Sequence, residues 1–166
     1  MRDLIQFAKP CLILILAFVV FFAIQIAALA LMWFSLGSRF AFSGDGPVAS
    51  DGWCMGMLAG TTLGSFVAGL VLAVGGKPNG ARLCLALALI LCALNAYGAV
   101  TVGERLAANS RMDVDLESIT FAEAGNFAVS PEWYYGLALF ANGAAVVAGG
   151  RLVRNGSQRK DTSSTP

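Results

Sequence analysis

Histidine is absent from this chain of 166 residues, and charged residues are scarce, at 13% of the sequence. Without histidine, the chain lacks the ligands for bis-histidine haem and for the usual histidine-centred zinc, copper or iron sites. Four cysteines are present, but none belongs to a C-x-x-C pair, which excludes a dithiol redox motif. The sequence therefore contains no catalytic or ligand-binding signature, and we expect no metal and no cofactor.

Long uncharged stretches are the main feature that the sequence does contain. Four segments carry no formal charge: 11–34, 53–76, 83–103 and 133–150. Because an α-helix rises about 1.5 Å per residue and the hydrocarbon layer is about 30 Å thick, roughly 20 apolar residues cross a membrane. We predict an all-α polytopic membrane protein, a four-transmembrane-helix bundle over residues 1–154. The polar tail, 155–166, is predicted to be disordered.

Lysine and arginine divide unevenly between the two sides that four spans would create. One side receives eight of the eleven basic residues and the other receives Arg39, Arg105 and Arg111. Short loops rich in Lys and Arg stay in the cytoplasm, so both termini are predicted to be cytoplasmic. A cleaved signal peptide is the alternative for the first segment, but its apolar run continues through Trp33 and Phe34, beyond the usual length.

Small residues recur at helical spacing in two segments, in the manner of a glycine zipper. They are Gly56, Gly60, Gly64 and Ala68 in the second segment and Gly136 and Gly143 in the fourth. Such faces let helix backbones approach closely, and we predict that both pack against other helices of this chain or of another. The bulkier first segment is expected to turn Ala23, Ala27 and Ala30 inward.

Uncharged polar residues lie at similar depths in the four segments: Gln25, Thr61, Thr62, Asn95 and Asn142. We interpret them as interhelical hydrogen-bonding groups that fix helix rotation. A polar substrate site or water path is the alternative. No Asp, Glu, Lys or Arg lies at mid-membrane, which argues against a self-contained proton-coupled carrier.

The connection between the third and fourth segments is acidic. Asp113, Asp115 and Glu117 alternate as at the start of a calcium loop, but Ser118 replaces the glycine that an EF-hand requires at its sixth position. We therefore expect a solvated loop. The third helix is predicted to extend to Asn109. Three apolar residues of the connection are predicted to cap the bundle: Phe121, Phe127 and Val129.

Two motifs support a resemblance to other proteins. Gly64-Ser65-Phe66-Val67-Ala68-Gly69 lies in the second segment, and Pro131-Glu132-Trp133 leads into a fourth segment that ends Gly149-Gly150-Arg151-Leu152. With these motifs the chain resembles uncharacterised small four-helix bacterial membrane proteins. The resemblance implies a bacterial inner-membrane location and supplies no activity.

These features favour a non-catalytic integral membrane protein that binds or organises other membrane components. Its expected partners are membrane lipids, another membrane protein or a second copy of itself, and not nucleic acid. The alternative is an oligomeric channel or transporter subunit for a small solute, lined by Thr61, Asn95 or Asn142. An enzyme comes third, with lipid chemistry at Tyr97, Glu104 and Arg105.

Overall fold

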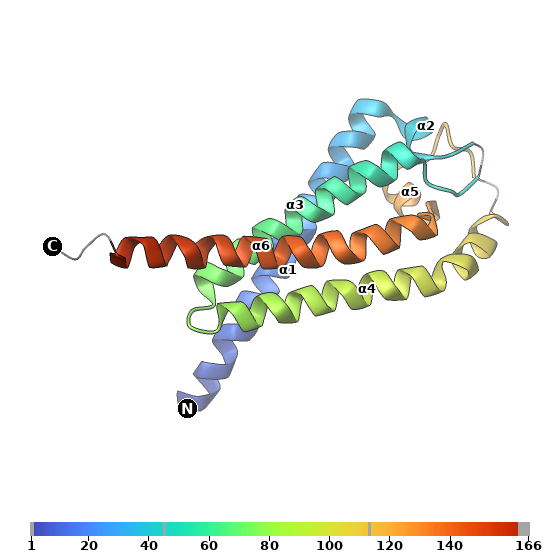
Figure 1. Cartoon of the computed structure of the whole chain (residues 1–166). Helices are drawn as coiled ribbons and strands as arrows, with labels where there is room; N and C mark the ends of the chain where they lie inside the picture. The colour runs from blue at the N-terminus through green and yellow to red at the C-terminus, as the bar shows by residue number, and fades with distance from the viewer. Residues whose placement is uncertain (1, 45, 113, 163–166) are drawn as a thin grey trace.

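Helices make up almost the whole molecule. The computed structural model describes residues 2–44, 46–112 and 114–162, and their side chains from residue 8 to residue 153. In chain order the helices are α1 (Arg2–Leu36), α2 (Ser38–Ala41), α3 (Asp51–Gly75), α4 (Gly80–Asn109), α5 (Phe121–Phe127) and α6 (Glu132–Thr162) (Figure 1). Helix accounts for 81% of the chain, and the described residues form no strand. The predicted all-α class is confirmed.

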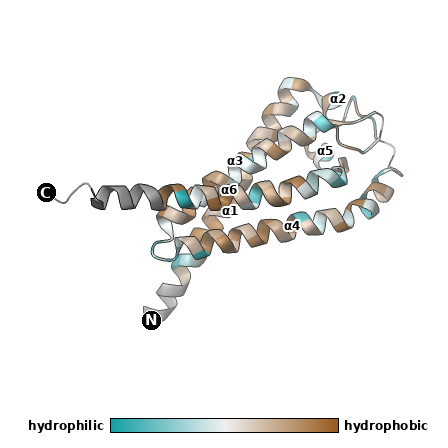
Figure 2. Cartoon of the chain, in the orientation of Figure 1, coloured by the Kyte–Doolittle hydropathy of each residue, from teal (hydrophilic) through white to brown (hydrophobic). Residues whose placement is uncertain are grey.

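Four of these helices are long and apolar enough to cross a membrane. The candidate spans are Ala8–Leu36, Asp51–Gly75, Gly80–Asn109 and Glu132–Val153. Figure 2 shows hydrophobic colour along the long helices and hydrophilic colour concentrated at the turn between α3 and α4 and near the opposite helix ends. The four predicted segments therefore correspond to four observed helices, as expected for a polytopic bundle.

The helix ends follow the local sequence. Helix α4 stops at Asn109, as predicted, where the Ser110 amide donates to the Leu106 carbonyl. Helix α6 begins directly after Pro131. Proline has no backbone N–H and is tolerated at the start of a helix, where amides have no partner within the helix. It continues to Thr162, beyond the predicted span and into the tail that was expected to be disordered. The first loop, between α1 and α3, contains the single turn α2.

The four long helices form an open arc and not a closed ring. Helices α3 and α6 are the central pair, α1 packs on α3, and α4 packs on α6. Helices α1 and α4, the two outer members, make few contacts with each other. They diverge toward the end that carries α2 and α5 (Figure 1). This divergence leaves room between them, which α5 partly fills.

A buried cluster closes the end of the bundle where α2 and α5 lie. Phe127 packs its ring against Phe42, and Trp33 packs against Trp53 and Phe121. Val129 is fully buried beside Phe127, so the predicted cap is formed, although Phe121 is only half-buried. Isolated backbone pairing of Val48 with Val129 ties the first loop to this cap.

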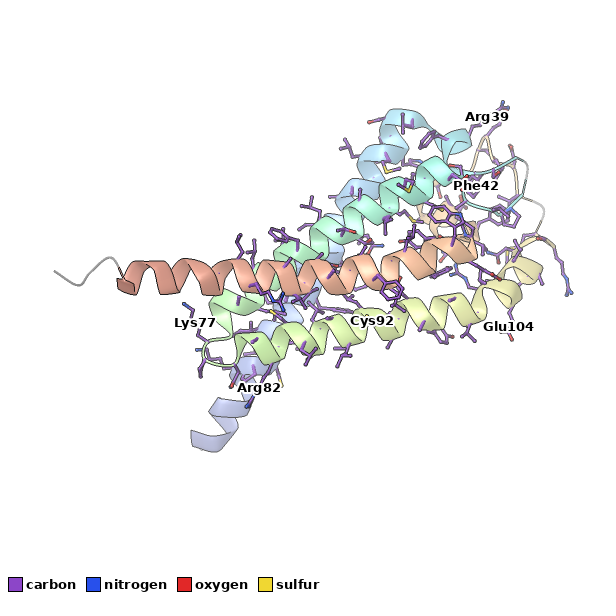
Figure 3. The ribbon with its side chains drawn as sticks, in the orientation of Figure 1. Arg39, Phe42, Lys77, Arg82, Cys92 and Glu104 are labelled. Carbon is purple, nitrogen blue, oxygen red and sulfur yellow. The ribbon has the colours of Figure 1, made fainter. Side chains whose placement is uncertain are left out.

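The two ends of the bundle carry opposite charge. All acidic side chains that the structure describes lie at the end with α2 and α5, here called the acidic end. The opposite end, at the turn between α3 and α4, carries Lys9, Lys77, Arg82 and Arg151 and is called the basic end. Figure 3 shows Glu104 at the first end, with Lys77 and Arg82 at the second.

Candidate functional site

The glycine face of α3 lies against α1. A Cβ atom placed on Gly60 would be 2.9 Å from the Ala28 Cβ, and one on Gly64 would be 2.9 Å from the Phe21 carbonyl oxygen. Gly56 faces the flexible side chain of Met32. The second-segment glycines therefore allow close approach of a helix of the same chain. The inward face of α1 is formed by Ala17, Phe21 and Trp33, whereas Ala23 and Ala27, expected inside, are exposed.

The tightest crossing joins α3 to α6. A Cβ on Gly69 would collide with the Val146 carbonyl, and a Cβ on Gly149 would collide with the Phe66 carbonyl. Ala68 is fully buried beside this crossing. The fourth-segment prediction needs correction, because a Cβ on Gly136 would meet nothing within 4 Å and one on Gly143 would make only ordinary contact with Cys92. The rotation of α6 instead directs Gly149, another small residue of the fourth segment, toward α3.

A cavity of about 790 Å³ lies between the diverging halves of α1 and α4. We call it the capped cavity because residues of α5 cover it. Its wall is formed by all six helices, and most of that wall is apolar or aromatic, including Phe21, Trp53, Leu91 and Tyr134. Pockets of this size, with a few polar groups in an apolar wall, are typical of small-molecule and cofactor sites.

Four of the five predicted intramembrane polar residues line the capped cavity: Gln25 from α1, Thr61 from α3, Asn95 from α4 and Asn142 from α6. The structure thus brings together groups that are more than 100 positions apart in the sequence. Thr62 does not line it, because adjacent helix residues point about 100° apart and only one of the two threonines can face inward. These polar groups form one site, which a periodicity argument on single helices does not reveal.

The hydrogen-bonding state of these groups differs. The Thr61 hydroxyl donates to the Leu58 carbonyl at 3.1 Å, and the Asn95 amide nitrogen donates to the Leu91 carbonyl at 2.8 Å. The Thr61 hydroxyl and the Asn95 amide nitrogen therefore have acceptors within their own helices. Asn142 is only 2% exposed, and its carboxamide oxygen has no hydrogen-bond partner. Buried polar groups are nearly always hydrogen-bonded, so this oxygen points to a missing partner.

The mouth of the capped cavity opens sideways between the outer helices. Phe22 and Ile26 of α1 and Leu94 of α4 line the cavity and are themselves exposed. In a membrane these side chains face the hydrocarbon layer. Arg105 lines the rim at the acidic end, where its guanidinium lies 3.5 Å from the Ala128 carbonyl. The site therefore combines a lateral apolar opening, one cation at the rim and side-chain amides in the cavity wall.

The capped cavity does not continue to the basic end. There the core contains Leu72, Leu87 and Val146, each fully buried. A second, smaller cavity near the basic end shares no lining residue with the first. Within the described chain, the two spaces are separate pockets and not one channel.

The residues considered for an enzyme do not converge. Tyr97 is 70% exposed on the outer face of α4, and Glu104 is exposed at the acidic end. Only Arg105 of the three lines the capped cavity. No group of three metal-ligating side chains occurs among the residues that the structure describes.

Helix α5 is the part of the site that sequence patterns missed. It is seven residues long and places Ala124 and Asn126 in the cavity wall. Its signal was present in Thr120 and Glu123, which form a capping box: Glu123 accepts from the Thr120 amide at 2.9 Å, and Thr120 Oγ1 accepts from the Glu123 amide at 3.3 Å. The Thr120 backbone and hydroxyl donors lower the pKa of Glu123.

Comparison with protein-family models, curated proteins and solved structures gives no match to this chain. The resemblance to small bacterial membrane proteins has no support from these comparisons. Functional inference therefore rests on the site itself.

Proposed function

We propose that this chain is a non-catalytic integral membrane protein that binds an amphiphilic membrane molecule, a lipid, in the capped cavity. The observation that carries the proposal is Asn142, a buried carboxamide whose oxygen lacks a partner in the wall of a large cavity. A bound headgroup bearing a hydroxyl or amine would hydrogen-bond to the Asn142 carboxamide. The proposed partner is thus a membrane lipid, one of the partners expected from the sequence.

The shape of the site supports a lipid over a water-soluble solute. A molecule that reaches the cavity between α1 and α4 comes from the hydrocarbon layer and passes Phe22, Ile26 and Leu94. Its apolar portion can remain against these side chains while its polar portion meets the amides. Arg105 at the rim adds attraction for a phosphate or carboxylate.

The alternative of a channel or transporter subunit receives less support. A path through a single chain would have to pass the buried core at Leu72, Leu87 and Val146. A conducting path would therefore lie between copies of the chain. We propose that the basic end lies in the cytoplasm, on the basis of the Lys and Arg asymmetry. A bacterial inner membrane is the location that the resemblance to small bacterial membrane proteins implies.

Lipid retention measures the proposed function directly. The protein is extracted in a mild detergent, and the lipids that copurify are quantified by native mass spectrometry. Asn142→Leu removes the unpartnered oxygen at similar volume, and we expect roughly threefold or greater loss of the retained lipid, the effect of one intramembrane hydrogen bond.

The matched control is Ser65→Ala. Ser65 is also fully buried with an unpartnered oxygen, but it does not line the capped cavity. Its variant should retain lipid as the wild type does. Equal lipid content in wild type and Asn142→Leu would refute lipid binding at this site. Protein-dependent solute flux in liposomes that Asn142→Leu alters would favour the transporter alternative.

A further inference from the structure

The smaller cavity lies at the basic end, between the turn that follows α3, the start of α4 and the last turns of the α6 span. Its volume is about 420 Å³. Apolar residues line it, among them Ala81, Leu85 and Val147, together with two cations, Lys77 and Arg151. We call it the basic groove. It is independent of the capped cavity, with which it shares no residue.

Among the side chains that the structure describes, neither cation has an acidic partner. The ion pair that the described side chains make is Arg39 with Glu117, at the opposite end of the molecule. Lys77 and Arg151 are exposed, and every described carboxylate lies at the acidic end. Arg82, one turn into α4, adds a third cation to the same region. The basic groove therefore combines an apolar lining with positive charge that no described carboxylate neutralises.

We infer that the basic groove binds an anionic phospholipid of the leaflet at the basic end. The phosphate of the headgroup would lie between Lys77 and Arg151, which are complementary to it in charge. An acyl chain would run along Leu85, which is 57% exposed, and Val147. The apolar lining selects a lipid over free phosphate, because an inorganic ion would leave these apolar side chains uncovered.

The start of α4 supports the placement of the phosphate. Asn79, the residue before α4, makes no side-chain hydrogen bond to cap it. Gly80 and Ala81, whose amides begin the helix, both line the groove. Uncapped amides at a helix N-terminus favour an anion, so they reinforce the attraction of the two side chains.

The test compares lipid binding by the full chain in nanodiscs. Discs contain phosphatidylcholine with a minor fraction of phosphatidylglycerol, and native mass spectrometry after release measures which lipid each protein retains. We expect wild type to retain phosphatidylglycerol preferentially. Lys77→Gln with Arg151→Gln should lower that preference at least about tenfold, since each cation near an anionic surface contributes about fivefold.

The control is Arg39→Gln with Arg111→Gln, which removes the same charge from the acidic end and should leave the preference unchanged. Because Lys77 and Arg151 are exposed, the double variant should fold. The wild type supplies a second measurement: its preference for phosphatidylglycerol should fall as the salt concentration is raised. Equal loss in both double variants would indicate a general charge effect and refute the groove. Equal retention of both lipids by wild type, or full displacement by inorganic phosphate, would also overturn the inference.

Discussion

A buried carboxamide with an unpartnered oxygen destabilises the protein that contains it, by roughly 1–3 kcal/mol. Asn142 is in this state when the capped cavity holds no ligand. We therefore predict that Asn142→Leu raises the melting temperature of delipidated protein while it lowers lipid retention. Differential scanning fluorimetry in detergent measures the first effect. A lower melting temperature would mean that Asn142 is a structural hydrogen-bonding group with partners inside the bundle.

The crossing of α3 and α6 depends on the absence of a side chain at one position. In Gly69→Ala the new Cβ would meet the Val146 carbonyl, so the helices must separate, at a cost of about 1–3 kcal/mol. We predict a clear loss of thermal stability. Gly136→Ala is the matched control on α6, because a Cβ at this position meets nothing within 4 Å. We expect this variant to change the free energy of unfolding by less than about 0.5 kcal/mol. Similar melting temperatures for both variants would contradict the observed crossing.

Residue spacing predicted some of these roles and not others. The four-residue repeat of Gly56, Gly60 and Gly64 predicted a packing face, because spacing fixes which residues share a side of a helix. Spacing does not fix how a helix is rotated relative to its neighbours. That is why Gly136 was assigned to a contact it does not make. The shared cavity of Gln25, Thr61, Asn95 and Asn142 also depends on relative rotation.

At the scale of elements, the capping box of Thr120 and Glu123 makes the stability of α5 depend on pH. The amide and hydroxyl of Thr120 donate to the Glu123 carboxylate and lower its pKa, so the folded cap prefers the ionised form. This stabilisation is present above the ordinary carboxyl pKa of about 4.3 and is lost as pH falls through the lower folded value.

We therefore predict that α5 loses protection from hydrogen exchange below about pH 4, measured as protection factors corrected for the intrinsic pH dependence of exchange. Glu123→Gln should show less protection at neutral pH and a flatter pH response. An acid-insensitive α5 in the wild type would rule out this role of the capping box.

Long elements and short ones differ in how well sequence predicts them. The four long helices follow from the uncharged runs. Lipid offers no hydrogen-bond partners to the backbone, and a helix pairs its N–H and C=O groups within the segment itself. Helix α4 even ends at the predicted Asn109. Helix α5 has seven residues, too few for a hydrophobic period, and tertiary contacts such as the packing of Phe127 against Phe42 stabilise it.

At the scale of the whole molecule, four spans place both termini on one side of the membrane. The charge asymmetry predicts that this side is the cytoplasm. We predict that Ser118→Cys reacts with a membrane-impermeant maleimide in intact cells and that Asn79→Cys reacts only after lysis. Both positions are exposed, so accessibility does not confound the comparison. Wild type gives the background from its four cysteines, and the reverse labelling pattern would invert the topology.

The separation of an acidic end from a basic end also makes the molecule an electric dipole along the membrane normal. With the basic end in the cytoplasm, a potential that is negative inside favours this orientation, by about 2.3 kcal/mol per elementary charge moved through 100 mV. Charged side chains in the described spans lie only near the span ends, where little of the voltage drop acts on them. In the predicted orientation, the membrane potential would favour this placement without driving an internal rearrangement, and we expect depolarisation to leave the conformation unchanged.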